Sequence, residues 1–145
     1  MTQFFTSRLN PDSETPDELD EEEIEPIQDD PLTKALYIVS AADSLKAEEI
    51  VALDLRGLTI IADFFIICTG NSSIQLRAIT DRVEERMREQ GFKKLRVEGY
   101  QEATWILLDY GDVVVHVMAA EQRAFYSIEE FWSEAPRLDL ELLPA

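Results

Sequence analysis

Residues 63–72 of the chain read Asp63-Phe64-Phe65-Ile66-Ile67-Cys68-Thr69-Gly70-Asn71-Ser72. The β-branched and aromatic residues that begin this run are typical of a strand buried on both faces of a sheet. Gly70 and Asn71 end the strand, and Ser72 has the capping-box spacing to Gln75 that marks a helix start. Apolar residues then recur at helical intervals up to Gly91, a common helix stop: Leu76, Ile79, Val83 and Met87. The run therefore predicts a buried strand followed directly by a long amphipathic helix.

The remaining elements are expected on both sides of this strand and helix. Upstream, a helix capped by Thr33 is expected to reach Ser44 or Lys46. Four further strands are expected over residues 49–55, 95–98, 104–108 and 113–118. Two short helices are expected over residues 121–125 and 127–132. The order α-β-β-α-β-β-β-α-α predicts an α/β fold of the mixed α+β kind, with one mixed sheet of about five strands and helices packed on it.

The hairpin expected between the last two strands has two possible registers. A two-residue loop of Tyr110 and Gly111 pairs Trp105 with His116 on one face, but it requires a positive φ at Tyr110. A three-residue loop with Gly111 in the left-handed region pairs Trp105 with Val115 and places His116 on the opposite face. Local sterics favour the three-residue loop, because a bulky side chain resists positive φ.

The tip of this hairpin gathers polar side chains in either register. Asp109, Tyr110 and Asp112 are expected there, where turns normally reach solvent. Aspartates are also common in turns because they bond to the turn backbone. By residue type alone, Trp105 is more often a packing residue, and His116 in a valine-rich strand is more often a hydrogen-bonded structural histidine.

Charge divides the chain of 145 residues, which has a formal net charge of −17. Residues 1–31 hold 11 acidic residues and one basic residue, so we expect a disordered acidic tail there. One domain is expected over residues 32–136, with a C-terminal extension over residues 137–145. The excess of acid disfavours non-specific binding to DNA, RNA or anionic membranes and favours partners with basic surfaces.

Counts of reactive residues limit the chemistry further. The single cysteine, Cys68, cannot form an internal disulfide, and one cysteine with one histidine cannot build a structural zinc site. We expect no metal or other cofactor. No apolar run reaches membrane-spanning length, and the start of the chain lacks the pattern of a signal peptide. These features predict a cytoplasmic protein.

Three blocks of sequence between residues 35 and 132 carry a family resemblance. They comprise residues 62–72 with Gln75, Arg77, Ala78 and Ile79; Glu98-Gly99, Trp105 and residues 107–117; and Arg123, Phe125-Tyr126, Glu129 and Trp132. In order and spacing these blocks resemble the ribosomal silencing factor (Iojap-like) family. The resemblance implies a nucleotidyltransferase-like α/β fold without established enzymatic activity.

The same resemblance implies a partner and a mechanism. Members bind the large ribosomal subunit through its protein fourteen (uL14), block joining of the small subunit and so repress translation when nutrients are short. A role in large-subunit assembly is also associated with the family. The place of Trp105, Asp109, Tyr110 and Asp112 in the second block makes them the candidate partner-binding residues of a monomer or weak homodimer.

Two other classes of function also fit parts of the sequence. Residues 69–72, a glycine turn that opens a helix, superficially suit phosphate binding by a nucleotidyltransferase-like enzyme. The next acidic residue, Asp81, lies more than two helical turns beyond Ser72, and His116 has no evident nucleophile to activate. A self-associating structural protein would use the Trp105 surface as its dimer interface. Catalysis is thus disfavoured by the residues, self-association is compatible with ribosome binding, and the non-enzymatic, ribosome-binding function is what the resemblance implies.

Overall fold

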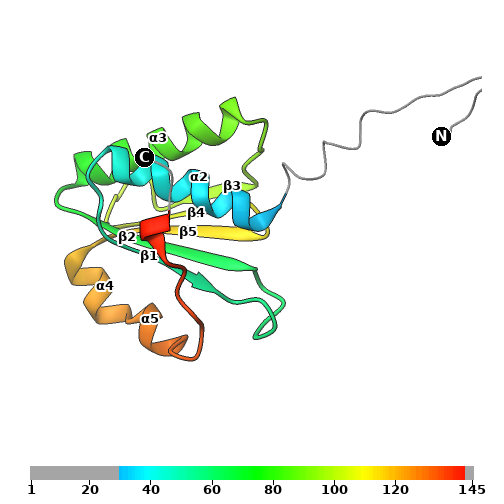
Figure 1. The fold of residues 1–145 in the computed structure, drawn as a ribbon. Helices are drawn as coiled ribbons and strands as arrows, with labels where there is room; N and C mark the ends of the chain where they lie inside the picture. Colours follow the sequence, from blue (N-terminus) through cyan, green and yellow to red (C-terminus); the bar gives the residue numbers. More distant parts are fainter. Residues whose placement is uncertain (1–29, 143–145) are drawn as a thin grey trace, which may run out of the picture. The chain divides into compact units, whose positions relative to one another are not determined.

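Five strands form one sheet in the computed structural model, which describes residues 30–142 of the chain (Figure 1). The strands are β1 (Glu48–Asp54), β2 (Phe64–Gly70), β3 (Arg96–Glu98), β4 (Trp105–Asp109) and β5 (Val113–Ala119). The helices are α2 (Pro31–Ser44), α3 (Ser73–Glu89), α4 (Ala120–Tyr126) and α5 (Ile128–Phe131), followed by a short 3-10 helix, η3 (Leu140–Leu142). The order of strands and α-helices is the predicted one, so the expected mixed fold is confirmed.

The strand order across the sheet is β1-β2-β5-β4-β3. β2 and β5 run parallel, whereas every other neighbouring pair is antiparallel. A parallel pair requires a long crossover connection, which α3 and the strands β3 and β4 supply. Six of the seven residues of β2 are buried, which confirms that this strand is covered on both faces. The sheet is mixed, as predicted.

Two hydrogen bonds that involve Gln75 form at the start of α3, one to the N-cap residue Ser72 and one to the preceding residue Asn71. Ser72 Oγ accepts the N–H of Gln75 at 3.0 Å, and Gln75 Oε1 accepts the N–H of Asn71 at 2.6 Å. These bonds satisfy backbone N–H groups that have no carbonyl partner at a helix start. The predicted strand-to-helix junction is therefore confirmed at the level of its capping contacts.

The predicted end of α3 was correct, whereas the predicted start of α2 was wrong. Gly91 follows the last turn of α3 with φ of 85°, the left-handed conformation expected of a glycine at this position. The cap predicted for α2 was wrong, because the helix begins at Pro31 and Thr33 lies inside its first turn. The fixed φ of proline suits the first position of a helix, where its missing N–H leaves no bond unmade.

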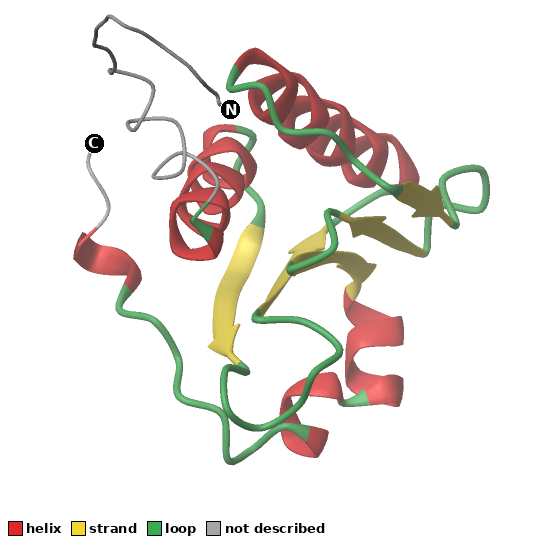
Figure 2. Cartoon of the chain, turned by 90° about the vertical axis from the view of Figure 1, so that its right-hand side faces the viewer, coloured by secondary structure: helices red, strands yellow, loops and turns green. Residues whose placement is uncertain are grey.

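The helices cover the two faces of the sheet unequally (Figures 1 and 2). α2 and α3 pack on one face, over the larger core, and Ile106 and Leu108 of β4 on that face are fully buried. α4 and α5 lie on the other face, where Trp105, Leu107 and Asp109 of β4 are only half-buried. We call this second face the outer face. Its smaller core consists of Leu53, Leu55, Ile67, Met118 and Ala135.

Both edges of the sheet are protected. The segment after α5 runs along β1, with the Asp54 N–H donating to the carbonyl of Pro136 at 2.8 Å and the Leu138 N–H to that of Ala52 at 2.9 Å. The opposite edge strand, β3, is only three residues long and carries Arg96 and Glu98. Covered, short or charged edges resist pairing with other chains.

The N-terminal tail expected over residues 1–31 lies almost wholly outside the described residues. In the expected C-terminal extension, Leu138 and Leu140 pack against the larger core. Among residues 30–142, no helix is long and apolar enough to span a membrane.

Candidate partner-binding site

The hairpin formed by β4 and β5 has neither of the registers considered from sequence. Trp105 pairs with Met118, and the pairing continues to the loop, where the Tyr110 N–H donates to the carbonyl of Val113 at 2.9 Å. The two-residue loop is therefore Gly111 and Asp112. Gly111 takes the first loop position with φ of 90°, which relieves Tyr110 of the strain that argued against a two-residue loop. Both predicted registers were wrong.

The observed register nevertheless places Trp105 and His116 together on the outer face. His116 pairs with Leu107, so it lies diagonally across from Trp105. The indole Nε1–H of Trp105 donates to His116 Nδ1 at 3.1 Å. The favoured three-residue loop, which placed His116 on the face opposite Trp105, was therefore wrong about the face as well as the pairing; only the disfavoured two-residue loop had put the two residues on one face.

His116 is a buried, neutral histidine with 4% of its surface exposed. Because burial disfavours the charged imidazolium, the pKa of His116 is lowered to about 4. Its second ring nitrogen, Nε2, has no hydrogen-bond partner among the described residues. The imidazole is therefore held by Trp105 on one side and by packing against Phe65, whose ring centroid lies 4.7 Å away.

Tyr110 does not reach solvent, contrary to the expectation for the hairpin tip. Only 5% of its surface is exposed, and it belongs to the larger core beneath α2 and α3. Alternation along the strand explains this position, because Tyr110 continues the inward-facing series of Ile106 and Leu108. Burial, with a smaller contribution from Glu84, raises the pKa of the Tyr110 hydroxyl. Tyr110 supports the hairpin from inside.

Asp109 and Asp112 are both bonded within the domain. Asp109 Oδ1 accepts the N–H of Gly111 at 2.7 Å, and its Oδ2 accepts from Arg96 Nε at 3.1 Å. Asp112 Oδ1 lies 3.1 Å from Lys34 Nζ, so this ion pair links the hairpin loop to α2. The four predicted residues therefore divide between two faces and a loop: Trp105 and Asp109 lie on the outer face, Tyr110 points inward, and Asp112 lies in the turn.

A series of aromatic rings crosses the outer face, which the sequence did not reveal as one feature. Neighbouring rings have centroids 4.7–6.2 Å apart. In order of contact the rings are Phe125, Tyr126, Trp105, His116, Phe65, Trp132 and Phe131. The two end members, Phe125 and Phe131, are strongly exposed. The series joins α4 and α5 to β2, β4 and β5, and it brings separate parts of the sequence to one surface.

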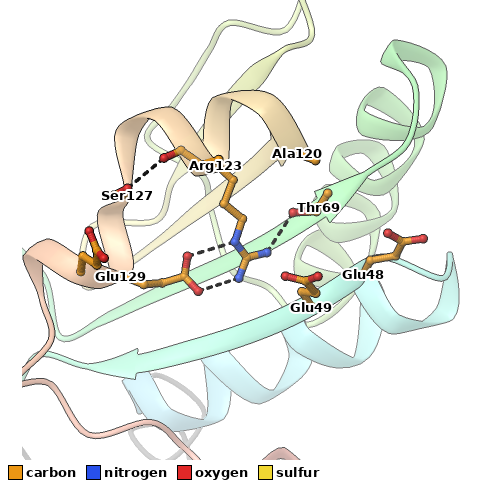
Figure 3. Close-up of a pocket in the computed structure, with 9 residues that line it drawn as sticks. Glu48, Glu49, Thr69, Ala120, Arg123, Ser127 and Glu129 are labelled. Atoms are coloured by element: carbon orange, nitrogen blue, oxygen red, sulfur yellow. Dashed lines mark hydrogen bonds and ion pairs between the residues drawn. The ribbon is translucent and has the colours of Figure 1, made fainter.

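A pocket of about 380 Å³ lies beside α4, at the ends of β1 and β2 (Figure 3). Arg123 reaches into this region from α4, where Nη1 donates to Thr69 Oγ1 at 2.9 Å. Its Nε and Nη2 donate to the two carboxylate oxygens of Glu129 at 3.0 and 2.8 Å. Glu48, Glu49 and Glu130 also line the pocket. Arg123 thus fixes α4 and the start of α5 against the end of β2. Its place in the third family block was the only sign of this structural role in the sequence.

The turn considered for phosphate binding is occupied by the chain's own contacts. Thr69 Oγ1 accepts from Arg123, and Ser72 Oγ accepts from the Gln75 N–H. The Asn71 N–H donates to Gln75 Oε1. Among the described residues, no group of three or more His, Cys, Asp or Glu side chains is arranged to hold a metal ion.

Comparison with known proteins identifies relatives that belong to one family. A family model described as "Ribosomal silencing factor during starvation" (RsfS) matches residues 28–145. Ribosomal silencing factor RsfS of Halalkalibacterium halodurans is 48% identical over 103 residues, covering 71% of this chain and 88% of the relative. The Bacillus subtilis protein of the same name is 43% identical over 102 residues, covering 70% and 86%. Protein Iojap of Zea mays chloroplasts is 38% identical over 109 residues, covering 75% of this chain and 47% of the relative.

Two solved structures share this fold. A crystal structure of a protein from Chromobacterium violaceum superposes with a TM-score of 0.70 at 33% identity, covering 72% of this chain and 87% of that one. A crystal structure from Bacillus halodurans gives a TM-score of 0.63 at 44% identity, covering 71% and 93%. Sequence and fold therefore point to the same group of proteins.

Proposed function

The chain belongs to the family of ribosomal silencing factors, and from this membership we propose that it binds the large ribosomal subunit through protein uL14. Bound there, it prevents the small subunit from joining and represses translation. Occupying a surface between the subunits is sufficient for this effect, so no bond has to be made or broken. We also propose that it acts in the cytoplasm and without catalysis.

The observation that supports this proposal most is the position of Trp105 on the outer face, where it stays half-buried beside Tyr126 of α4. Trp105 is half-buried, and its ring is held between His116 and Tyr126, so it is already ordered before a partner arrives. Tryptophan is enriched among the residues that dominate binding energy at protein interfaces. A preordered ring loses little conformational entropy on binding.

The acidic residues of the hairpin supply the charge in this proposal. Residues 32–145 have 19 acidic and 12 basic residues, so ribosomal RNA repels the domain and a basic ribosomal protein attracts it. Asp109 on the outer face and Asp112 in the loop are the proposed acidic complement to the arginine and lysine side chains of uL14. Tyr110, being buried, contributes by holding the hairpin in place.

Sedimentation with separated ribosomal subunits tests the proposed function. We expect the protein to co-sediment with free large subunits and to be depleted from small subunits and assembled ribosomes. Adding the protein to large subunits before small subunits should reduce the yield of assembled ribosomes. Preferential association with the small subunit, or unchanged assembly at saturating protein, would overturn the proposal.

A further inference from the structure

The exposed aromatic side chains of α4 continue the surface that contains Trp105. The Tyr126 ring centroid lies 4.7 Å from that of Trp105, and the Phe125 centroid lies 4.9 Å from that of Tyr126. Phe125 is 79% exposed and Tyr126 is 51% exposed. Most of the Phe125 ring therefore faces water, so burial in the fold does not account for its position.

The exposed charges on residues 120–134, the segment that contains α4 and α5, are of one sign, and the next exposed cation along the chain is Arg137. The exposed acidic side chains within residues 120–134 are Glu121, Glu130 and Glu134. The only basic residue of this segment, Arg123, is buried and makes two hydrogen bonds to Glu129. An approaching cation therefore meets carboxylates and aromatic faces without a competing exposed cation on the same two helices.

We propose that Phe125 and Tyr126 extend the Trp105 contact and receive an arginine side chain of the basic protein partner. This inference rests on the proposed function and specifies the chemistry of its contact surface. A guanidinium group is planar and weakly hydrated, so it stacks on aromatic rings more readily than an ammonium group. The carboxylates of α4 and α5 raise the local concentration of the basic partner, and the rings supply the short-range contact.

Substitutions at Phe125 separate this contact from folding and from simple apolar packing. Because the ring is mostly exposed, Phe125→Ala should leave the unfolding midpoint close to that of the wild type. Its affinity for large subunits should fall about 3-fold to 30-fold, the range that corresponds to a cation–π contact. Phe125→Leu keeps an apolar side chain without a ring and should bind as weakly as Phe125→Ala. Phe125→Trp keeps a ring and should bind at least as well as the wild type.

Ile74→Ala is the matched control for these variants. Ile74 is 75% exposed on α3, which packs on the opposite face of the sheet, so its removal should change neither stability nor affinity. Each variant is measured with intact large subunits and with purified uL14 alone. A loss at Phe125 that is equal with both partners supports a protein contact.

Four results would overturn the inference, and each has a different meaning. Wild-type affinity of Phe125→Ala would remove the ring from the interface and leave the proposed function standing. Wild-type affinity of Phe125→Leu beside weak binding of Phe125→Ala would show an apolar contact without a cation. A loss seen with subunits but not with purified uL14 would place the ring against ribosomal RNA. If the wild type itself fails to bind large subunits, the proposed function fails, and the inference fails with it.

Discussion

The indole N–H of Trp105 donates to Nδ1 of His116 over 3.1 Å, and this bond defines the protonation state of the histidine. A donor can approach Nδ1 only when that nitrogen carries no proton, so the imidazole is neutral and its proton lies on Nε2. Burial favours the same state, because it lowers the pKa of His116 to about 4. The orientation of Trp105 is thus tied to a neutral histidine beneath the outer face.

Acidification should therefore destabilise the domain through His116. The pKa is about 6.5 in the unfolded chain and about 4 in the fold, so the unfolded state binds the proton first. The stabilisation is complete above pH 6.5 and declines as pH falls towards 4. The full loss corresponds to about 3 kcal/mol. His116→Leu cannot bind this proton. As pH falls through this interval, the unfolding free energy of the wild type should therefore decrease relative to that of the variant. Parallel pH profiles of the two proteins would contradict the assignment.

Replacing Asp109 and Asp112 together by Asn tests whether their charges reach the partner. The double variant keeps the shape of both side chains but weakens the ion pairs with Arg96 and Lys34. Because these pairs are partly exposed, the unfolding free energy should fall by only about 0.5–1 kcal/mol. If the carboxylates also face uL14, affinity for large subunits should fall, and it should depend less on salt concentration.

Lys34→Gln is the matched control for this variant. It breaks one of the two ion pairs, that of Asp112, from the α2 side and leaves both carboxylates charged. Loss of stability in both variants with loss of binding only in the double Asn variant would identify interface charges. Equal binding by the folded fraction of both variants and the wild type, at low and high salt, would restrict the two aspartates to a structural role.

The parts of the fold that were predicted correctly depend on contacts close in sequence. Ser72 and Gln75 bond within one helical turn, and the apolar run of β2 shows its burial directly. The hairpin register was missed because it depends on which loop position Gly111 takes, and the usual signals allow several. The burial of Tyr110 depends on helices distant in sequence, α2 and α3, covering one face of the sheet.

The candidate site was predicted in part for the same reason. Trp105 was identified through its family block, and it lies half-buried on the outer face, while its role in binding stays a prediction. The contact of Arg123 with Thr69 joins residues 54 positions apart, so no local pattern could reveal it. The aromatic series likewise combines residues from two helices and three strands, and alternation within a single strand predicts only its own members.

Replacing Arg123 by Lys should destabilise the junction between α4 and α5. An ammonium group cannot reproduce the paired bonds to Glu129 together with the bond to Thr69, so we expect a loss of about 1–3 kcal/mol. Hydrogen bonds from Arg123 lower the pKa of the Glu129 carboxyl below its usual 4.5. The stabilisation from Glu129 is therefore present above about pH 4.5 and is lost as pH falls further.

Glu129→Gln provides the control for that pH dependence. Its unfolding free energy should be lower than that of the wild type at pH 7, and the gap should narrow below pH 4.5 as Glu129 becomes protonated in the wild type. A gap that stays constant with pH would show that the charge of Glu129 contributes little.

Arg123→Lys should also leave α4 less firmly held against the sheet. Faster amide hydrogen exchange in α4 of the variant would measure this effect.

Gly99 lies against the backbone of Trp105, the proposed contact residue. Substitution of Gly99 therefore tests stability and binding together. A Cβ atom built on Gly99 would lie 2.2 Å from the carbonyl oxygen of Trp105. Gly57 has a similar φ, 84° against 79°, but an added Cβ there meets no atom within 4 Å. Gly57→Ala should therefore cost about 1 kcal/mol for its left-handed backbone alone, whereas Gly99→Ala should cost about 2–4 kcal/mol. Chemical denaturation measures both. If the start of β4 shifts to relieve the clash, folded Gly99→Ala should also bind large subunits more weakly than Gly57→Ala. Equal stability and equal binding of the two variants would show that the backbone of Trp105 yields without moving its ring.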